Sequence, residues 1–221
     1  MSAEIELRAA RVRYGPLEAL HGLDLPVPAG TVTVLLGRNG AGRTTALRAL
    51  AGTVGLSAGR VLWRGADVTR LPPHERARRG LCFVPDLRAV YEGLTVAENL
   101  ALTVPGGDDS PAPYPELVPL LSRAAGTLSG GERRMLALSR ALLGHARVVL
   151  VDEPSLGMAP PVAARTYGLL AALAVERGAA VVLAEQRVPE GLPRGSLVHE
   201  LRRGSRASSG EPYEYARGAT P

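Results

Sequence analysis

A glycine-rich stretch carries the clearest chemistry in the sequence. It follows an apolar run, Val32–Leu36, and precedes residues 46–51, which have helical character and end at Gly52. A strand, a glycine-rich turn and a helix N-terminus are typical of a phosphate-binding loop, because the glycines let backbone N–H groups converge on an anion and the helix dipole adds partial positive charge. We expect phosphate contacts from Gly37, Arg38, Asn39, Gly40, Ala41, Gly42, Arg43, Thr44 and Thr45.

Arg43 is the single departure from the spacing G-x-x-x-x-G-K-[ST], in which a lysine reaches the β- and γ-phosphates. Arginine keeps the positive charge but replaces a compact ammonium group with a wider, planar fork. Such a fork can crowd the phosphates, and a misplacement of about 1 Å can cost on the order of 100-fold in rate. The sequence contains no lysine, which explains how the arginine arose but not that it is harmless.

Two consecutive acidic residues follow a second apolar run, at 148–151. Asp152 ends this expected strand, where a buried carboxylate is costly unless a cation compensates it. A Mg²⁺ ion that also binds the Thr44 hydroxyl group would do so. Glu153 is then placed to polarise an attacking water as a general base. A strand end can carry such a pair for structural reasons alone, but the phosphate-binding loop upstream favours the functional interpretation.

A second anion-binding corner follows further along the chain. A serine and two glycines stand at the start of an amphipathic helical pattern, where backbone N–H groups can again face an anion. The two corners lie 92 residues apart (129 minus 37), and one phosphate group needs only one of them. The spare corner therefore predicts a contact with a nucleotide held by a partner chain. It consists of Leu128, Ser129, Gly130, Gly131 and Glu132.

The spacing of the apolar segments predicts the fold class. Buried strands at 148–151 and 180–184 alternate with helices, and this alternation indicates an α/β fold with a mostly parallel central sheet. Short alternating segments before residue 36 predict a small antiparallel β region at the N-terminus. A length of 221 residues suits one such domain with a small inserted lobe. The expected units are a domain over residues 1–203, a helical lobe within it at about 87–140, and a flexible tail at 204–221.

The net charge of +5 is weak support for binding to nucleic acid. The arginines are scattered, and the densest cluster, Arg76, Arg78 and Arg79, fits a solvated helix face, so we expect no nucleic-acid partner. No run approaches the roughly 18 apolar residues of a membrane span, and the N-terminus lacks the pattern of a signal peptide. We therefore expect a soluble, cytoplasmic protein. Cys82 lies in an apolar run and is interpreted as a buried core thiol.

The ordered set of motifs resembles the ATP-binding subunit of ABC transporters over about residues 3–200, and Leu-Ser-Gly-Gly-Glu at 128–132 is highly specific for that family. The resemblance implies a P-loop NTPase fold with ATP and Mg²⁺ as cofactors. It also implies a head-to-tail pair of subunits that clamps ATP between one phosphate-binding loop and the other subunit's corner at 129–131. Tyr14 would stack on the purine base, although a structural turn tyrosine remains the alternative.

Within that family the sequence looks most like the subunit of branched-chain amino-acid importers. Asp86 stands where other members carry the Q-loop glutamine, and Gln186 stands where they carry the switch histidine. The resemblance therefore assigns Asp86 to metal binding and catalysis, and Gln186 to catalysis. The implied partners are a second ATP-binding subunit (in a homo- or heterodimer), integral membrane permease subunits at the inner face of the cell membrane and, indirectly, a substrate-binding protein.

Further departures keep an alternative open. Only 28 residues separate Asn99 from Leu128, and the segment after Gln186 lacks the helix usual in the family, although 197–201 can form the terminal strand. Compared with the family, the helical lobe is thus expected to be contracted. The resemblance implies an ATP-hydrolysing motor subunit, and Arg43 together with these departures leaves as the alternative a nucleotide-binding but catalytically weak or inert ABC subunit with a regulatory or structural role. A soluble ABC-type protein acting on ribosomes or DNA is disfavoured, because such proteins generally carry two of these domains or long coiled-coil insertions.

Overall fold

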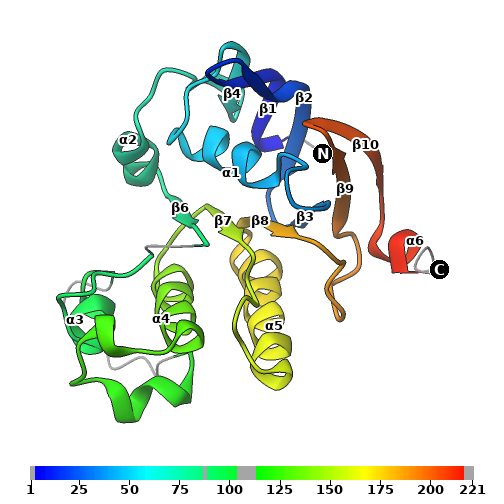
Figure 1. The fold of residues 1–221 in the computed structure, drawn as a ribbon. Coiled ribbons are helices and arrows are strands. Elements are labelled where there is room, and N and C mark those ends of the chain that lie inside the picture. Colours follow the sequence, from blue (N-terminus) through cyan, green and yellow to red (C-terminus); the bar gives the residue numbers. More distant parts are fainter. Residues whose placement is uncertain (1–2, 87–88, 104–112, 217–221) are drawn as a thin grey trace.

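The computed structural model describes residues 3–86, 89–103 and 113–216, which form an α/β fold around two sheets (Figure 1). The first sheet is antiparallel, in the order β2-β1-β4-β5, and confirms the antiparallel region predicted at the N-terminus. Its strands are β1 (Ala3–Tyr14), β2 (Leu17–Pro28), β4 (Ala58–Trp63) and β5 (Ala66–Asp67).

The second sheet is the mostly parallel sheet that the sequence predicts. Its strands run in the order β10-β9-β3-β8-β7-β6, and only β10 is antiparallel to its neighbour. Every residue of β7 and β8 is buried, which is why their sequences are nearly continuous apolar runs. The strands are β3 (Val32–Leu36), β6 (Leu81–Val84), β7 (Val148–Asp152), β8 (Ala180–Glu185), β9 (Leu197–Arg202) and β10 (Ser205–Gly210).

The carboxyl ends of the parallel strands meet along one edge of this sheet. Leu36 at the end of β3 pairs with Glu185 at the end of β8, and Asp152 at the end of β7 pairs with Ala184. Loops that leave such an edge are where open α/β sheets bind their ligands. The register therefore brings the phosphate-binding loop, Glu153 and Gln186 to the same edge.

Helices cover both faces of the second sheet (Figure 1). α1 packs in one core with residues of both sheets, whereas α4 and α5 pack in a second core on the opposite face. Within the described residues, none of the helices has both the length and the apolar character of a membrane span. The helices are α1 (Arg43–Ala51), α2 (Pro73–Arg78), α3 (Val96–Ala101), α4 (Gly130–Leu143), α5 (Pro160–Arg177) and α6 (Pro212–Ala216), with 3₁₀ helices η1 (Pro115–Leu120) and η2 (Ala125–Thr127).

The region expected to form a helical lobe contains α3, both 3₁₀ helices and most of α4. The spacing of Thr95 and Glu98 in the sequence predicts a capping box at a helix start, and α3 begins with it: the Glu98 N–H donates to Thr95 Oγ1 and the Thr95 N–H donates to the Glu98 carboxylate. Part of the expected lobe, at 87–88 and 104–112, lies outside the described residues. After residue 112, but still within the expected lobe, buried Tyr114 and Leu117 anchor η1 in the core beside α4.

The prediction of a flexible tail is wrong for residues 205–216, which form β10 and α6. β10 pairs with β9, whose free edge would otherwise expose unpaired backbone groups. The sequence gives little sign of this strand, because the β10 residues are small, polar and largely exposed. Residues 217–221 lie outside the described part of the chain.

The solvated face predicted for α2 is wrong at Arg76, which is 1% exposed. Its guanidinium group donates to five backbone carbonyl oxygens, including those of Ala49 and Leu50 in the last turn of α1 at 2.9 and 2.7 Å. Carbonyl groups at a helix end have no partner within the helix, so a buried arginine satisfies them. Cys82 is half-buried rather than fully buried, and burial raises the pKa of its thiol group.

Candidate functional site

The glycine-rich turn has the backbone shape of a phosphate cradle. Gly40 and Gly42 have φ angles of 79° and 105°, which residues with a Cβ atom rarely adopt. A Cβ atom on Gly37 would lie 2.7 Å from the carbonyl oxygen of Leu201 in β9, so the close strand also requires glycine. No side chain caps the N-terminus of α1 after Gly42. The N–H groups of its first turn therefore face the place where an anion can bind.

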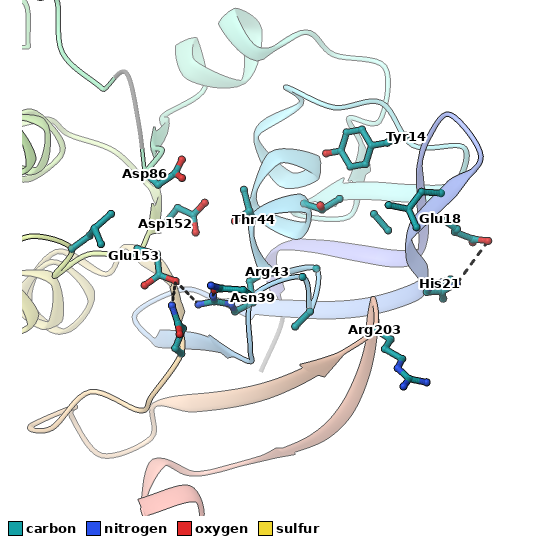
Figure 2. Close-up of a pocket in the computed structure, with 18 residues that line it drawn as sticks. Tyr14, Glu18, His21, Asn39, Arg43, Thr44, Asp86, Asp152, Glu153 and Arg203 are labelled. Atoms are coloured by element: carbon teal, nitrogen blue, oxygen red, sulfur yellow. Dashed lines mark hydrogen bonds and ion pairs between the residues drawn. The ribbon is translucent and has the colours of Figure 1, made fainter.

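A cleft of about 780 Å³ opens along the carboxyl edge of the second sheet. Figure 2 shows the Tyr14 ring on one side of this cleft and Asp86 on the other. Tyr14 is 43% exposed, and such an exposed ring leaves room for a base to stack. Gly37 and Arg38 line the adjoining groove beside β9. The predicted residues that the cleft brings together are Tyr14, Asn39, Gly40, Ala41, Gly42, Arg43, Thr44, Thr45, Asp86, Asp152, Glu153 and Gln186.

The Asp152 carboxyl group is suited to act as a metal ligand. It is 1% exposed, and its Oδ2 atom has no hydrogen-bond partner among the described residues. Burial raises the pKa of Asp152, and the carboxylates of Asp86 and Glu153 act in the same direction, whereas the Thr44 hydroxyl group and the charge of Arg43 oppose them. A buried oxygen without a partner, next to a second carboxylate and a hydroxyl group, is the kind of donor set that Mg²⁺ prefers.

Arg43 points at the predicted general base. Its Nη1 atom lies 2.8 Å from Glu153 Oε1, and its Nη2 atom donates a weak hydrogen bond of 3.4 Å to Asn39 Oδ1 (Figure 2). Gln186 Nε2 lies 3.4 Å from the same Glu153 oxygen. The geometry between Nη1 and Oε1 is not that of a hydrogen bond, so the contact is mainly electrostatic. In this conformation the P-loop cation neutralises the carboxylate that would activate water.

The corner at 128–132 lies outside the cleft. Ser129 caps α4 in a capping box, because its Oγ atom accepts from the Glu132 N–H at 3.3 Å while Glu132 accepts from the Ser129 N–H at 2.7 Å. None of its five residues lines the cleft that holds the phosphate-binding loop. A single copy of the described chain therefore keeps its two anion-binding corners apart.

Sequence reasoning missed the wall of the cleft made by β2 and by the turn between β9 and β10. The Gly204 N–H donates to the Ala41 carbonyl oxygen at 2.9 Å, and Gly204 accepts from the His21 N–H at 3.0 Å. Only a glycine in the turn hints at the hairpin, because β10 has little apolar pattern of its own. The lining residues that were missed are Leu17, Glu18, Ala19, His21, Leu156 and Arg203.

Arg134 was also missed, although it holds the sheet edge together. It is 4% exposed on α4 and donates to the backbone carbonyl oxygens of Pro85, Asp152 and Pro154. These carbonyl groups belong to the ends of β6 and β7, where Asp86 and Glu153 begin their loops. The only sequence signal was an arginine on the apolar side of a helix, which long side chains often occupy without function.

A phosphate-binding loop after β3 and an acidic end on β7, on one edge of a parallel sheet, define a P-loop nucleotide-binding protein. A family model described as ABC transporter matches residues 20–156, which is more than half of the chain. The chain therefore belongs to the ABC transporter family and is an ABC-type ATPase.

Several relatives match over most of both chains, among them the lipopolysaccharide export system ATP-binding protein LptB of Acidithiobacillus ferridurans, which is 30% identical over 97% of this chain and 92% of its own. The high-affinity branched-chain amino acid transport ATP-binding protein BraG of Pseudomonas aeruginosa is 35% identical over 86% of this chain and 85% of its own. The probable branched-chain amino acid transport ATP-binding protein LivF of Archaeoglobus fulgidus is 32% identical over 91% and 89%. The sulfate/thiosulfate import ATP-binding protein CysA of Mycobacterium tuberculosis is 37% identical, but over 70% of this chain and 46% of its own.

The fold agrees with a solved ATP-binding cassette of an ABC transporter, MJ1267. The TM-score is 0.81 at 23% identity, and the match covers 98% of this chain and 94% of the other. This likeness confirms the predicted fold class.

Proposed function

We propose that this ATPase drives an importer of branched-chain or related amino acids. Two relatives that combine identities of 35% and 32% with a match over most of both chains are ATP-binding proteins of branched-chain amino acid transport. Because CysA belongs to sulfate import and LptB to lipopolysaccharide export, the substrate class rests on the higher identity of BraG and LivF among relatives that match over most of both chains, and not on the family alone. Integral membrane permease subunits and a substrate-binding protein complete the transporter, and this subunit lies at the cytoplasmic face of the membrane.

The observation that carries the proposed activity is the set of groups along one sheet edge. The loop at 37–45 and the N-terminus of α1 bind the phosphates of ATP, and Tyr14 stacks on its base. Thr44, Asp152 and Asp86 hold Mg²⁺, which supplies positive charge to the phosphates. Glu153 takes a proton from the attacking water, and Gln186, 3.4 Å from Glu153, orients that water.

We further propose that the complete site needs a second ATP-binding subunit. The corner at 129–131 lies outside the cleft of its own chain, and its glycines and the N-terminus of α4 suit an anion. A head-to-tail pair would place this corner of one subunit over the nucleotide of the other. The partner is either a second copy of this chain or a related subunit.

Replacing Glu153 with glutamine tests the motor function. We expect kcat of Mg²⁺-dependent ATP hydrolysis to fall at least about 100-fold, because the amide cannot act as a general base, while nucleotide affinity stays within about twofold. Glu176→Gln, an exposed position on α5, is the matched control. Absence of hydrolysis by the wild type, both alone and with its permease subunits, would refute the proposal.

A second candidate function is a nucleotide-binding subunit that hydrolyses ATP weakly or not at all. The ion pair between Arg43 and Glu153 favours it, because an occupied general base cannot activate water. Such a subunit would bind ATP, pair with a competent partner and act as a structural or regulatory component. The effect of residue 43 on the rate of ATP hydrolysis therefore distinguishes the motor subunit from the weak or inert subunit.

A further inference from the structure

The side chain of Tyr167 connects three elements behind the nucleotide site. Tyr167 lies on α5, and its hydroxyl group bonds Glu185 Oε1 at the end of β8 and Ser155 Oγ, at 2.9 Å, in the loop after β7. A hydroxyl group has one proton, so it donates to one of these oxygens and accepts from the other group. Glu185, Tyr167 and Ser155 thus form one continuous series of hydrogen bonds.

Both ends of this series of hydrogen bonds lie next to residues of the proposed reaction. Glu185 directly precedes Gln186, and Ser155 follows Glu153 by two positions. Glu153 has a φ angle of 50°, a left-handed conformation that costs roughly 1–2 kcal/mol in a residue with a side chain. Its N–H donates to the Ala184 carbonyl oxygen at 3.0 Å, which fixes one side of the loop. The bond to Ser155 fixes the other side.

The same loop contacts the corner at 129–131. A Cβ atom on Gly131 would lie 2.6 Å from the Gly157 carbonyl oxygen, so the two backbones are in close contact. The Met158 N–H donates to the Ser155 carbonyl oxygen at 3.0 Å, which closes a turn between Ser155 and that contact. A shift of the loop at Ser155 would therefore reach Glu153 on one side and the corner on the other.

Burial of the Glu185 carboxyl group has a desolvation cost. It is 6% exposed, and burial, with the neighbouring Glu153 charge, raises its pKa to about 7 against the opposing effects of Tyr167, Arg43 and Arg134. An apolar side chain would avoid this desolvation cost, whereas a carboxyl group gives Tyr167 a strong and directional partner. The proposed reaction gives Glu185 no chemical step, so its effect is on the position of its neighbours.

We propose that Tyr167 is a positioning residue that ties the loop after β7 to the end of β8, and so keeps Glu153 and Gln186 in the arrangement that hydrolysis requires. This inference rests on the proposed ATPase function. Among the described residues, the Tyr167 hydroxyl group bonds Ser155 and Glu185 and not the phosphate-binding loop, so we expect its removal to change catalysis and not nucleotide binding.

The test compares Tyr167→Phe, which keeps the ring, with Tyr213→Phe, an exposed tyrosine on α6. We expect kcat of the Tyr167 variant to fall about 10-fold with KM for ATP within about twofold, because the reacting groups lose their alignment. Glu185→Gln keeps an acceptor for Tyr167 and retains most of the activity, whereas Glu185→Leu reproduces the loss. An unchanged kcat in Tyr167→Phe would overturn the inference.

Hydrogen exchange on the full chain separates this inference from the activity itself. In Tyr167→Phe we expect faster exchange of the backbone amides at 153–158 and at Gln186, with those of α1 unchanged. If the wild type hydrolyses no ATP, the motor function fails, and the exchange result alone then decides whether Tyr167 holds the two segments. Unchanged exchange at both segments would show that it does not.

Discussion

At the scale of single residues, Arg43 sets the state of the site. Its side chain is 7% exposed and that of Glu153 is 21% exposed, so water screens their 2.8 Å contact only partly. The fork of the arginine lets one nitrogen face Glu153 while the other reaches Asn39. A lysine would have to make both contacts from the single ammonium nitrogen of a flexible side chain, without the planar fork. Under the proposed function, ATP must draw Arg43 away from Glu153 before the carboxylate can act as a base.

We therefore expect Arg43→Lys to raise kcat for ATP hydrolysis about 10-fold, with nucleotide affinity changed by less than about threefold. Arg48→Lys is the matched control, because Arg48 is an exposed arginine on the same helix. Steady-state hydrolysis and nucleotide binding are measured on both variants. An unchanged kcat would mean that Arg43 already works as the family lysine does, whereas activity only in the variant would favour the inert subunit.

At the scale of elements, the hairpin of β9 and β10 supports the phosphate-binding loop from behind. Gly204 in its turn has a φ angle of 75°, and a Cβ atom there would lie 2.3 Å from the Ala19 carbonyl oxygen. Gly195 has a similar φ angle of 81°, but nothing lies within 4 Å of its Cβ position. A residue with a Cβ atom would therefore be strained by the left-handed backbone at either position, but it would collide with a neighbour only at position 204.

Alanine at each glycine separates these effects. Both variants should lose about 1 kcal/mol of unfolding free energy to backbone strain, and Gly204→Ala should lose a further 1–3 kcal/mol, roughly, because the turn must move. Since Gly204 bonds Ala41, only that variant should also bind nucleotide several-fold more weakly. Chemical denaturation and nucleotide titration give both quantities. Equal effects at the two positions would contradict a supporting role for the hairpin.

The elements that the sequence predicts well are those whose signals are local. The phosphate-binding loop, the capping box at Thr95 and the buried strands each depend on residues close to one another in the chain. β10 lacks such a signal, because it forms on the edge of β9 and has little apolar pattern of its own. The contact between Arg43 and Glu153 likewise depends on which strands are neighbours, which no spacing in the sequence determines.

At the scale of the whole molecule, two buried groups have opposite effects on stability as pH changes. The pKa of Glu185 is raised to about 7, so its protonated form stabilises the fold at low pH, and this contribution is lost as pH rises from about 4.5 through 7. Burial lowers the pKa of His199 to about 4, so its contribution is lost as pH falls from 6.5 through 4. Each shift is worth about 3 kcal/mol, and between pH 5 and 6.5 the changes of the two contributions with pH largely offset one another.

Single substitutions should reveal how each group makes the unfolding free energy depend on pH. In Glu185→Gln only His199 remains of the pair, so the unfolding free energy, measured by urea denaturation at fixed ionic strength, should rise by about 2–3 kcal/mol relative to wild type between about pH 5 and pH 8. His199→Asn, which can keep the bond to Ser209, should instead fall relative to wild type between about pH 4 and pH 6.5. Comparison with wild type cancels the groups common to all three proteins. If both variants keep the wild-type pH profile, neither group is buried in the ionisation state assigned to it, and the carboxyl group that Tyr167 contacts is solvated in solution.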